Sequence, residues 1–266
     1  MKKRMPQKEL DTLKRFIEEK ISEAEDIWQQ VVPDIMELAE DGSLRKFAKA
    51  ITQIPGYEEI EEDINVVDDF VILMADMRNS TKHLTTACSD ATQGATGLKR
   101  LFIETSILLP AMAKTISFGK GKTLEYLGDG VLAAYRVKKG TESSVIYDAH
   151  HSAEKIVECV VDIINPLIKH YYNLPPLSVG IGIARSQGIV RMVGIENFLV
   201  PKVFGKSVFY ASKLCGGENE IYLDEMAHGM WPKVKPGEKA VVSFKKIPII
   251  KNGEKSCDGY KIQYNE

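Results

Sequence analysis

Two aspartates in this chain stand where apolar strands run out into turns. Asp76 follows the apolar run 70–75, and Asp129 is the middle residue of a Gly-Asp-Gly triplet. The triplet separates the stretches 122–127 and 131–135, a pattern that predicts a β-hairpin. The chain is therefore expected to build a sheet in which both aspartates lie at strand ends.

Each aspartate has an ordinary structural interpretation and a chemical one. Asp76 alone suits a helix N-cap, and Asp129 alone suits a hairpin turn. If the two side chains converge, they form an oxygen-rich site of the kind that two divalent cations need to hold a triphosphate. Neither residue by itself decides between these readings.

Size and charge limit the possible partners. The chain has 266 residues, a net charge of −2 and a pI near 6.3, so neither nucleic acid nor an anionic membrane is an expected partner. The N-terminus has no signal-peptide core, and no apolar stretch approaches the roughly 20 residues that span a bilayer. The cysteines show no CxxC spacing and predict reduced thiols in a cytoplasmic protein; they are Cys88, Cys159, Cys215 and Cys257.

The first quarter of the chain is predicted to be helical. Apolar residues recur at steps of three or four from residue 7 to 32, with Pro33 expected to stop or kink the helix. This helix either packs on the domain or pairs with a second copy, because its other faces are heavily charged. A short helix is expected over 44–52. We predict a helical extension at 1–64 and a main domain at 65–266.

From residue 66 onward the pattern predicts an α+β fold. The expected elements are a strand at 66–75, a helix resuming through 101–116, the hairpin 122–136, a helix at 144–171, a strand at 177–184, a turn at 185–188, a strand at 189–193, a helix at 207–214, and late strands at 220–223, 240–247 and 260–264. The order β-α-β-β-α-β indicates a ferredoxin-like core with a C-terminal extension.

Two further patterns lack the spacing that their chemistry needs. The stretches 119–123 and 205–207 resemble phosphate loops, but neither has the required glycine five residues earlier. His150 and His151 are adjacent within a predicted helix, whereas a metal pair on a helix needs a spacing of three or four. They are expected to be surface histidines.

Four stretches in order resemble the class III nucleotidyl cyclase family of adenylate and guanylate cyclases. They are FVILMADMRNST at 70–81, LEYLGDGVLAAY at 124–135, SVGIGIARSQG at 178–188 and VFGKSVFYASKL at 203–214. The second stretch is the most specific. The resemblance covers roughly residues 68–224 and implies the cyclase fold as a head-to-tail homodimer.

The resemblance implies a role for each matched residue. Asp76 and Asp129, with the main-chain carbonyl of Met77, would hold two Mg²⁺ or Mn²⁺ ions. The triphosphate would be cradled by a turn made of Arg78, Asn79, Ser80 and Thr81, with Lys255 as a further phosphate ligand. The resemblance also implies that one subunit supplies the metal site, and that its partner supplies the residues that read the base and stabilise the transition state.

Three departures from the family pattern bear on the substrate. Phe209 replaces the ribose-positioning Asn. Lys213 replaces the catalytic Arg that stabilises the transition state, and it keeps the positive charge but lacks the forked N–H donors of a guanidinium. The base-reading pair is Glu125 and Lys202, where adenylate cyclases of this family carry Lys and Asp. The polarity is thus reversed, which suits guanine or uracil better than adenine.

The bulk of Phe209 favours the smaller pyrimidine, and the compact chain resembles the stand-alone pyrimidine cyclases of bacterial Pycsar anti-phage systems. This implies a uridylate or cytidylate cyclase, UTP before CTP, whose product is read by a separate effector. The alternatives are a guanylate or adenylate cyclase, and a degenerate cyclase fold that acts as a regulatory nucleotide-binding module. A polymerase-palm or diguanylate-cyclase relative is disfavoured because the Gly-Gly-Asp/Glu-Glu-Phe signature is absent from the hairpin.

Overall fold

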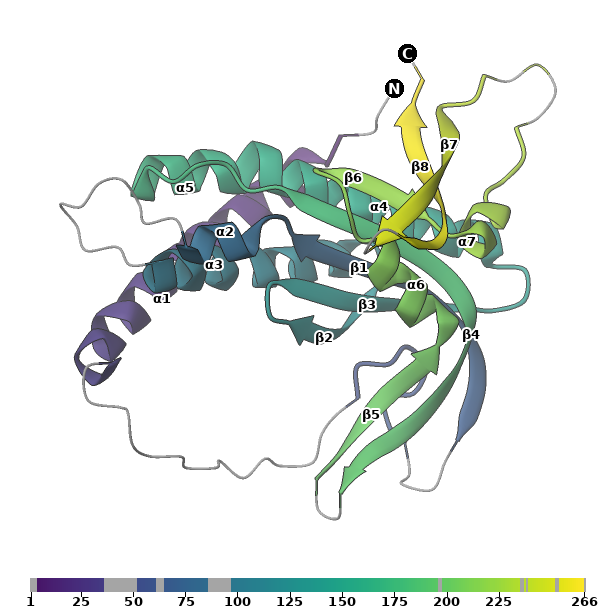
Figure 1. Ribbon diagram of the computed structural model, residues 1–266, viewed down its shortest axis with the longest axis horizontal. Coiled ribbons are helices and arrows are strands. Elements are labelled where there is room, and N and C mark those ends of the chain that lie inside the picture. The colour runs from purple at the N-terminus through teal and green to yellow at the C-terminus, as the bar shows by residue number, and fades with distance from the viewer. Residues whose placement is uncertain are drawn as a thin grey trace.

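The computed structural model describes residues 4–35, 52–60, 65–85, 97–195, 198–234, 237, 239–251 and 254–265. The fold is built on one eight-stranded sheet in the order β2-β3-β1-β4-β6-β8-β7, with β5 paired to β4 outside this path (Figure 1). The strands are β1 (Val66–Met77), β2 (Lys122–Leu127), β3 (Gly130–Val137), β4 (Val179–Ile195), β5 (Phe198–Gly205), β6 (Glu220–Leu223), β7 (Val242–Lys251) and β8 (Glu254–Tyr264).

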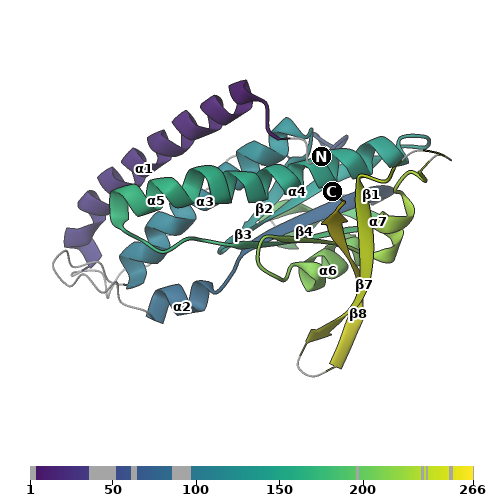
Figure 2. The same ribbon diagram turned by 90° about the horizontal axis from the view of Figure 1, so that it is seen from above.

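Helices cover the sheet on both faces, which makes the fold a mixed α+β one (Figure 2). They are α1 (Gln7–Ile35), α2 (Ser80–Thr85), α3 (Gly97–Phe118), α4 (Glu142–Cys159), the π-helical turn η2 (Val160–Ile164), α5 (Asn165–Tyr172), α6 (Lys206–Leu214) and α7 (Glu225–Gly229). Along the chain the first elements run β1, α2 and α3, β2, β3, α4 and α5, β4. In the sheet these strands stand in the order β2-β3-β1-β4, all neighbours antiparallel.

The main core lies between the sheet and the layer formed by α3, α4 and α5. Alternate residues of β1, including Val71, Leu73 and Ala75, point into this layer and are fully buried. The intervening residues Phe70 and Ile72 are buried on the opposite face, in a smaller core under α6. Because both faces of β1 are covered, its sequence is a continuous apolar run rather than an alternating one.

Helix α6 lies directly on β4, and Gly182 makes that approach possible. A Cβ built on Gly182 would stand 2.1 Å from the carbonyl oxygen of Ala211 and 2.8 Å from the amide nitrogen of Cys215. No other residue type fits so close to the helix backbone. Gly182 thus fixes where α6, and the side chains it carries, lie over the sheet.

Helix α1 packs on the domain itself. Leu13, Ile17 and Ile21 are at most 6% exposed and belong to the same core as α3 and β1. The ammonium group of the buried Lys155 in α4 pairs with Glu9, and the backbone N–H of Met5 donates to the Glu158 carboxylate at 3.0 Å. For residues 7–26 this supports the packed arrangement, and the predicted boundary at residue 64 therefore separates parts that share a core.

The structure tests the expected end of the first helix but not the short helix expected after it. The helix continues past Pro33 to Ile35, so this proline does not end it. The helix expected over 44–52 lies outside the described residues, except for Thr52, as does Cys88.

The turn expected at 185–188 is wrong, because the 17-residue strand β4 passes through these positions without a break and then forms a hairpin with β5. The polar residues there have partners across the sheet. The guanidinium of Arg185 donates to the Asp69 carboxylate at 2.6 Å, and the Ser186 hydroxyl accepts from the backbone N–H of Ser207 at 2.9 Å. Strand β5 has no counterpart in the expected elements. The late strands are also longer than expected, since β7 extends to Lys251 and β8 begins at Glu254.

Helix α3 corrects the expectation that no apolar stretch reaches membrane-spanning length. Among the described residues it is the one helix long and apolar enough to cross a bilayer, by length and composition only. It packs between α1, α4 and the sheet, and it buries two charged side chains, Arg100 and Glu104. These contacts are those of a core helix.

Candidate active site

Asp76 and Asp129 lie side by side where β1 meets the β2–β3 hairpin. Asp76 is the partner of Gly130 across the β1–β3 ladder, and the backbone N–H of the next residue, Met77, donates to the carbonyl oxygen of Asp129 at 3.1 Å. Both side chains are partly exposed. The sheet register therefore brings the two aspartates next to each other at the end of β1, a place that we call the carboxylate edge.

The hairpin glycines give the Asp76 carboxylate its space. A Cβ on Gly130 would stand 2.8 Å from Oδ1 of Asp76 and 2.7 Å from the carbonyl oxygen of Ala75. Gly128, at φ +64°, adopts the left-handed conformation that the turn requires. The Gly-Asp-Gly triplet is thus explained by one close approach and one turn.

Arg78 places a cation close to Asp76. Its Nη1 lies 3.8 Å from Oδ2 of Asp76 and donates to the carbonyl oxygen of Cys215 at 3.4 Å. Its backbone N–H donates to the carbonyl oxygen of Ser178 at 2.9 Å. Arg78 therefore ties the end of β1 to the segment that follows α6, and its charge faces the carboxylate edge.

The expected phosphate turn leads into α2. Asn79 has φ +61°, and its side-chain amide lies 3.5 Å from the Glu218 carboxylate. Its carbonyl accepts from the backbone N–H groups of Lys82 and His83, so α2 begins at Ser80 with Thr81 in its first turn. The backbone changes direction here, immediately after the metal-site strand.

A buried ion cluster that the sequence analysis missed holds α2 in place. His83 Nδ1 lies 2.7 Å from Oε2 of Glu104, and Arg100 Nε donates to Oε1 of the same carboxylate at 2.8 Å. Glu104 is fully buried and Arg100 is 5% exposed. The four-residue spacing of Arg100 and Glu104 within a helix was the available signal.

A cavity of about 360 Å³ opens beside Asp76. Arg78 lines it from the turn after β1, and Lys213 and Cys215 line it from α6 and the segment after it. The segment Pro248–Ile250 of β7 closes the far side. One chain thus brings the predicted metal carboxylate and the predicted catalytic Lys213 to a single cavity.

Lys213 also contacts Phe209, the residue that departs most from the family pattern. The two lie one turn apart on α6, with the Lys213 Nζ 5.1 Å from the centre of the Phe209 ring. The Phe209 ring is 54% exposed. Phe209 therefore presents an aromatic face to solvent where the family has an amide.

The two predicted base-binding residues form an ion pair. Lys202 Nζ on β5 lies 2.7 Å from Oε2 of Glu125 on β2, and both side chains are about one-third exposed. Two residues that lie 77 positions apart in the sequence thus meet at one point. The side chain of the last predicted site residue, Lys255, lies outside what the structure describes, and its backbone belongs to β8.

The donor atoms at the carboxylate edge are all oxygens. They are the two carboxylates of Asp76 and Asp129 and the nearby main-chain carbonyls. In the described part of the chain no group of three or more His, Cys, Asp or Glu side chains is placed so that it could hold a metal ion. Such a donor set fits Mg²⁺ or Mn²⁺ sites completed by substrate phosphates and water, and it does not fit a structural zinc site.

Known structures share this fold. The guanylyl cyclase Cya2 is 17% identical with a TM-score of 0.59, covering 74% of this chain and 93% of that one. The adenylyl cyclase CyaB from P. aeruginosa is 15% identical with a TM-score of 0.57, covering 76% and 96%. A dimeric guanylyl cyclase domain of the RhoGC fusion protein from the fungus Blastocladiella emersonii is 12% identical with a TM-score of 0.53, covering 76% and 98%.

No family model and no curated protein sequence matches the chain. The structural likeness spans nearly the whole length of each cyclase domain compared, and about three quarters of this chain. The chain has the fold of adenylyl and guanylyl cyclase catalytic domains.

Proposed function

We propose that this protein is a metal-dependent nucleotidyl cyclase that converts a ribonucleoside triphosphate into a 3′,5′-cyclic nucleotide and pyrophosphate. The observation that carries the proposal is the placement of Asp76 and Asp129 side by side at the end of β1 and the β2–β3 turn. Within a cyclase fold, that edge is where a triphosphate and its cations need carboxylate ligands.

In the proposed reaction, the ribose 3′-hydroxyl loses its proton to water and its oxygen bonds to the α-phosphorus. The bond from that phosphorus to the oxygen that bridges the α and β phosphates breaks, and pyrophosphate leaves. Bound Mg²⁺ or Mn²⁺ would supply charge neutralisation and a lower pKa of the 3′-hydroxyl. Asp76, Asp129 and the Met77 carbonyl would hold the cations. The turn Arg78–Thr81 orients the triphosphate, and Lys213 balances the charge that develops as pyrophosphate leaves.

The carboxylate assignment is tested by Asp76→Asn and Asp129→Asn. Each variant loses a cation ligand while keeping its shape, so cyclic nucleotide formation should fall on the order of 100-fold or more. Product is measured by chromatography and the fold by circular dichroism. Asp162→Asn, an exposed aspartate of η2, is the matched control and should keep full activity. Normal turnover in either site variant would remove the metal assignment.

We further propose that the base is a pyrimidine, UTP before CTP. The Glu125 carboxylate would accept the uracil N3–H and the Lys202 ammonium would donate to O4. The two groups lie 2.7 Å apart, so a base would enter by separating them and taking one bond from each. Phe209 would narrow the space beside them.

A charge swap tests this assignment. Glu125→Lys combined with Lys202→Asp restores the Lys and Asp of the adenylate cyclases that the sequence resembles. The double variant should lose UTP turnover and gain ATP turnover, each by about tenfold, since a carboxylate and an ammonium that face the wrong edge of a base are left unpaired. Competition assays with equal UTP and ATP measure the ratio; an unchanged ratio would remove the two residues from base recognition.

Guanylate cyclase activity is the second candidate. The same pair suits guanine, with Glu125 accepting from N1–H and N2–H₂ and Lys202 donating to O6, and Cya2 is a guanylyl cyclase by name. Phe209→Asn distinguishes the pyrimidine cyclase from the guanylate cyclase. A wider pocket should raise GTP turnover relative to UTP turnover only if Phe209 excludes the purine.

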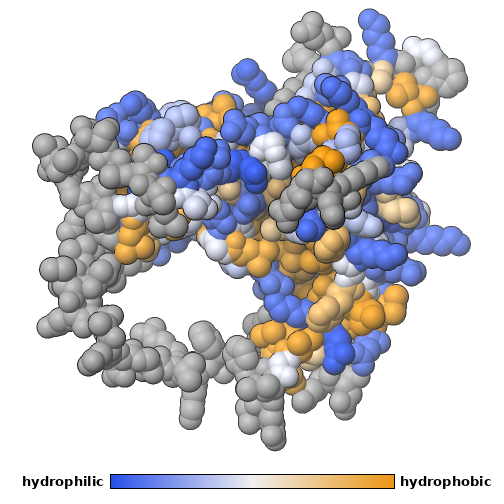
Figure 3. All heavy atoms as spheres, in the orientation of Figure 1, coloured by the Kyte–Doolittle hydropathy of each residue, from blue (hydrophilic) through white to orange (hydrophobic). Residues whose placement is uncertain are grey.

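A homodimer with shared sites is part of the proposal. Exposed apolar side chains gather over the β4–β5 arm, at the lower right of Figure 3, including Ile189 at 43% and Phe204 at 48% exposure. Such a patch marks an interaction surface. By resemblance to the Pycsar cyclases, the product would be an anti-phage alarm signal read by a separate effector in the cytoplasm.

The alternative from another class is a catalytically degenerate module that binds a nucleotide. The contact between Lys213 and the Phe209 ring favours it, because it holds the predicted catalytic cation against an apolar partner. Tight triphosphate binding without turnover would support this alternative.

A further inference from the structure

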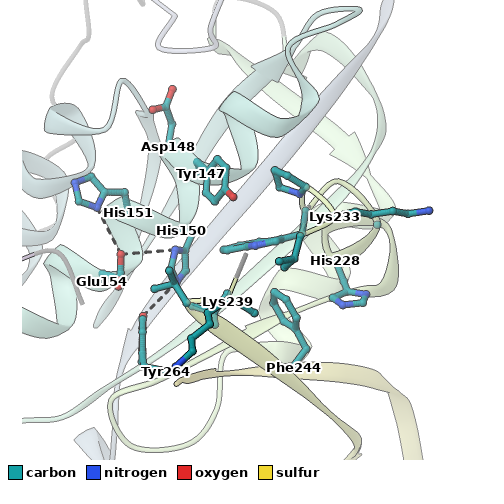
Figure 4. Close-up of a pocket in the computed structure, with 17 residues that line it drawn as sticks. Tyr147, Asp148, His150, His151, Glu154, His228, Lys233, Lys239, Phe244 and Tyr264 are labelled. Carbon is teal, nitrogen blue, oxygen red and sulfur yellow. Dashed lines mark hydrogen bonds and ion pairs between the residues drawn. The ribbon is translucent and has the colours of Figure 1, made fainter. Parts of the chain in front are cut away.

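A second and larger cavity, of about 960 Å³, lies between α4, the segment after α7, the start of β7 and the end of β8 (Figure 4). Among the described residues it shares no lining residue with the cavity beside Asp76. Its size is that of a small-molecule site. None of the residues assigned to cyclase chemistry lines it.

The walls of this cavity are aromatic. The Trp231 ring contacts three lining rings edge-on, with centroids 5.1 Å from Tyr147, 4.9 Å from His150 and 5.1 Å from Phe244. Aromatic walls of this kind bind flat rings by stacking and edge contacts. The wall chemistry therefore favours a planar ligand over a branched aliphatic one.

One wall carries a buried polar group. His150, expected to lie at the surface, is only 5% exposed, because α4 turns it into the cavity wall between Glu154 and Tyr264 (Figure 4). Its Nδ1 lies 3.6 Å from Oε2 of Glu154, and its Nε2 lies 3.2 Å from the Tyr264 hydroxyl. Burial, and then the charge of Glu154, raises the pKa of Tyr264, which keeps its hydroxyl protonated.

This polar wall is matched to a hydrogen-bond donor on the ligand. The Glu154 carboxylate is 10% exposed and lines the cavity, so it can accept an N–H from a ring. A ligand anion at that position would be repelled. The ring edge of the ligand therefore belongs next to Glu154, and any anionic group belongs elsewhere.

Two exposed cations, Lys233 and Lys239, also line the cavity. The described acidic residues of the lining are Glu154 and Asp148, and Asp148 lies 3.6 Å from the ammonium of Lys120. Positive charge thus dominates the solvent-exposed part of the lining. An anionic substituent would find its partners there.

We propose that this cavity binds a planar heteroaromatic ring carrying an anionic group, of the chemical class of a nucleoside monophosphate. The ring stacks against Trp231 and directs an N–H toward Glu154, and the phosphate pairs with Lys233 and Lys239. The site is separate from the proposed cyclase centre and does not depend on it, so a nucleotide bound here acts as an effector of the protein and not as its substrate.

Fluorescence of Trp231 tests the proposal. The chain has two tryptophans, so Trp28→Phe leaves Trp231 as the one reporter. This protein is titrated in EDTA with the four 5′-monophosphates and the four 3′,5′-cyclic monophosphates. At least one should quench Trp231 saturably with one site per chain. A cyclic ligand would identify the reaction product as the effector, and a 5′-monophosphate a separate metabolite.

Two cavity variants with matched controls complete the test. Gly229 lines the cavity and a Cβ there meets no atom within 4 Å, so Gly229→Leu should fill space that Gly229→Ala leaves open. Lys233→Glu with Lys239→Glu should weaken binding by roughly tenfold, whereas Lys14→Glu with Arg15→Glu on the exposed face of α1 should not.

Quenching that is weakened or lost in either cavity variant and kept in Asp129→Asn supports the site. Absence of saturable quenching by all eight nucleotides overturns it, as does quenching that both cavity variants retain at wild-type strength. Loss of the quenching in Asp129→Asn would also overturn it, because the nucleotide would then be bound at the carboxylate edge. Since no turnover is measured, failure of the cyclase proposal leaves this outcome unaffected.

Discussion

At the residue scale, the site depends on the space above Gly130. The Asp76 carboxylate occupies the position that a side chain at 130 would take. A carboxylate held in one orientation by its surroundings is better prepared to bind a cation than one that must be ordered on binding. The Gly-Asp-Gly triplet thus positions both carboxylates, although only one residue of the three carries a charge.

Gly130→Ala tests this dependence. The added methyl group would stand within 3 Å of both Asp76 Oδ1 and the Ala75 carbonyl oxygen, so the hairpin or the carboxylate must shift. We expect a loss of about 1–3 kcal/mol in the free energy of unfolding and a larger fall in metal-dependent turnover. Urea denaturation and product assays measure the two effects. Gly229→Ala, whose added methyl group meets no neighbour, should lower neither stability nor turnover, and wild-type turnover in Gly130→Ala would contradict the account.

The sequence was enough to place Asp76 and Asp129 at strand ends, because apolar runs and a Gly-Asp-Gly turn are local signals. The contact between Glu125 and Lys202 was not a local signal. It depends on β5, which brings Lys202 across the molecule to β2, and only the family resemblance linked the two residues. The buried cluster of His83, Arg100 and Glu104 was missed because His83 joins it from another helix.

At the scale of elements, α7 is joined to β4 by one buried carboxylate. Asp224 accepts from the backbone N–H of Ala227 at 2.8 Å, as the N-cap of α7, and from that of Arg185 at 3.1 Å. Burial raises its pKa from 3.8 to about 6. Because the folded-state pKa lies above the ordinary value, the stability that protonated Asp224 contributes is complete below about pH 4 and is lost as the pH rises through 6.

Asp224→Asn should therefore stabilise the protein at neutral pH. Asparagine keeps the N-cap but cannot ionise, so the cost of burying the charge disappears. The variant should exceed the wild type by about 1–3 kcal/mol in the free energy of unfolding at pH 7 and match it at pH 4. Urea denaturation at both pH values gives the difference, with Asp162→Asn as the exposed control. A variant less stable at pH 7 would show that the charge strengthens the cap.

The element order could be derived from periodicity, since most helices and strands are amphipathic or apolar runs. The β4–β5 hairpin could not. Its polar residues Arg185 and Ser186 carry turn-like composition, and their strand conformation depends on partners such as Asp69 and Ser207 that lie far away in sequence. Polar side chains whose hydrogen-bond partners lie in distant segments do not mark a strand in the local sequence.

At the scale of the whole molecule, the site residues could come from one subunit or from two. Asp76 and Lys213 line one cavity within a chain, whereas the family resemblance implies that metal and transition-state residues come from different subunits. In a head-to-tail dimer each chain contributes one half to each of two sites. Both arrangements use the same residues, so a single variant gives the same result in each. Dimers that combine two different variants distinguish them.

Mixing two inactive variants resolves the question. Asp76→Ala and Lys213→Ala should each be inactive alone. If the sites are shared, their heterodimer contains one intact site, and an equimolar mixture should recover about one quarter of wild-type activity. Turnover after co-refolding measures it, and mixing Asp76→Ala with Asp129→Ala, which alter the same half-site, is the control that should recover nothing. Persistent inactivity of the first mixture would place both residues in one chain's site.

The cyclase assignment itself is tested most directly by substrate. The purified protein is incubated with each of the four ribonucleoside triphosphates and Mn²⁺, and the products are separated and identified by mass. The account predicts a 3′,5′-cyclic nucleotide and an equal amount of pyrophosphate, from UTP before CTP, with no product from Asp129→Asn. No cyclic nucleotide from any of the four triphosphates would contradict it.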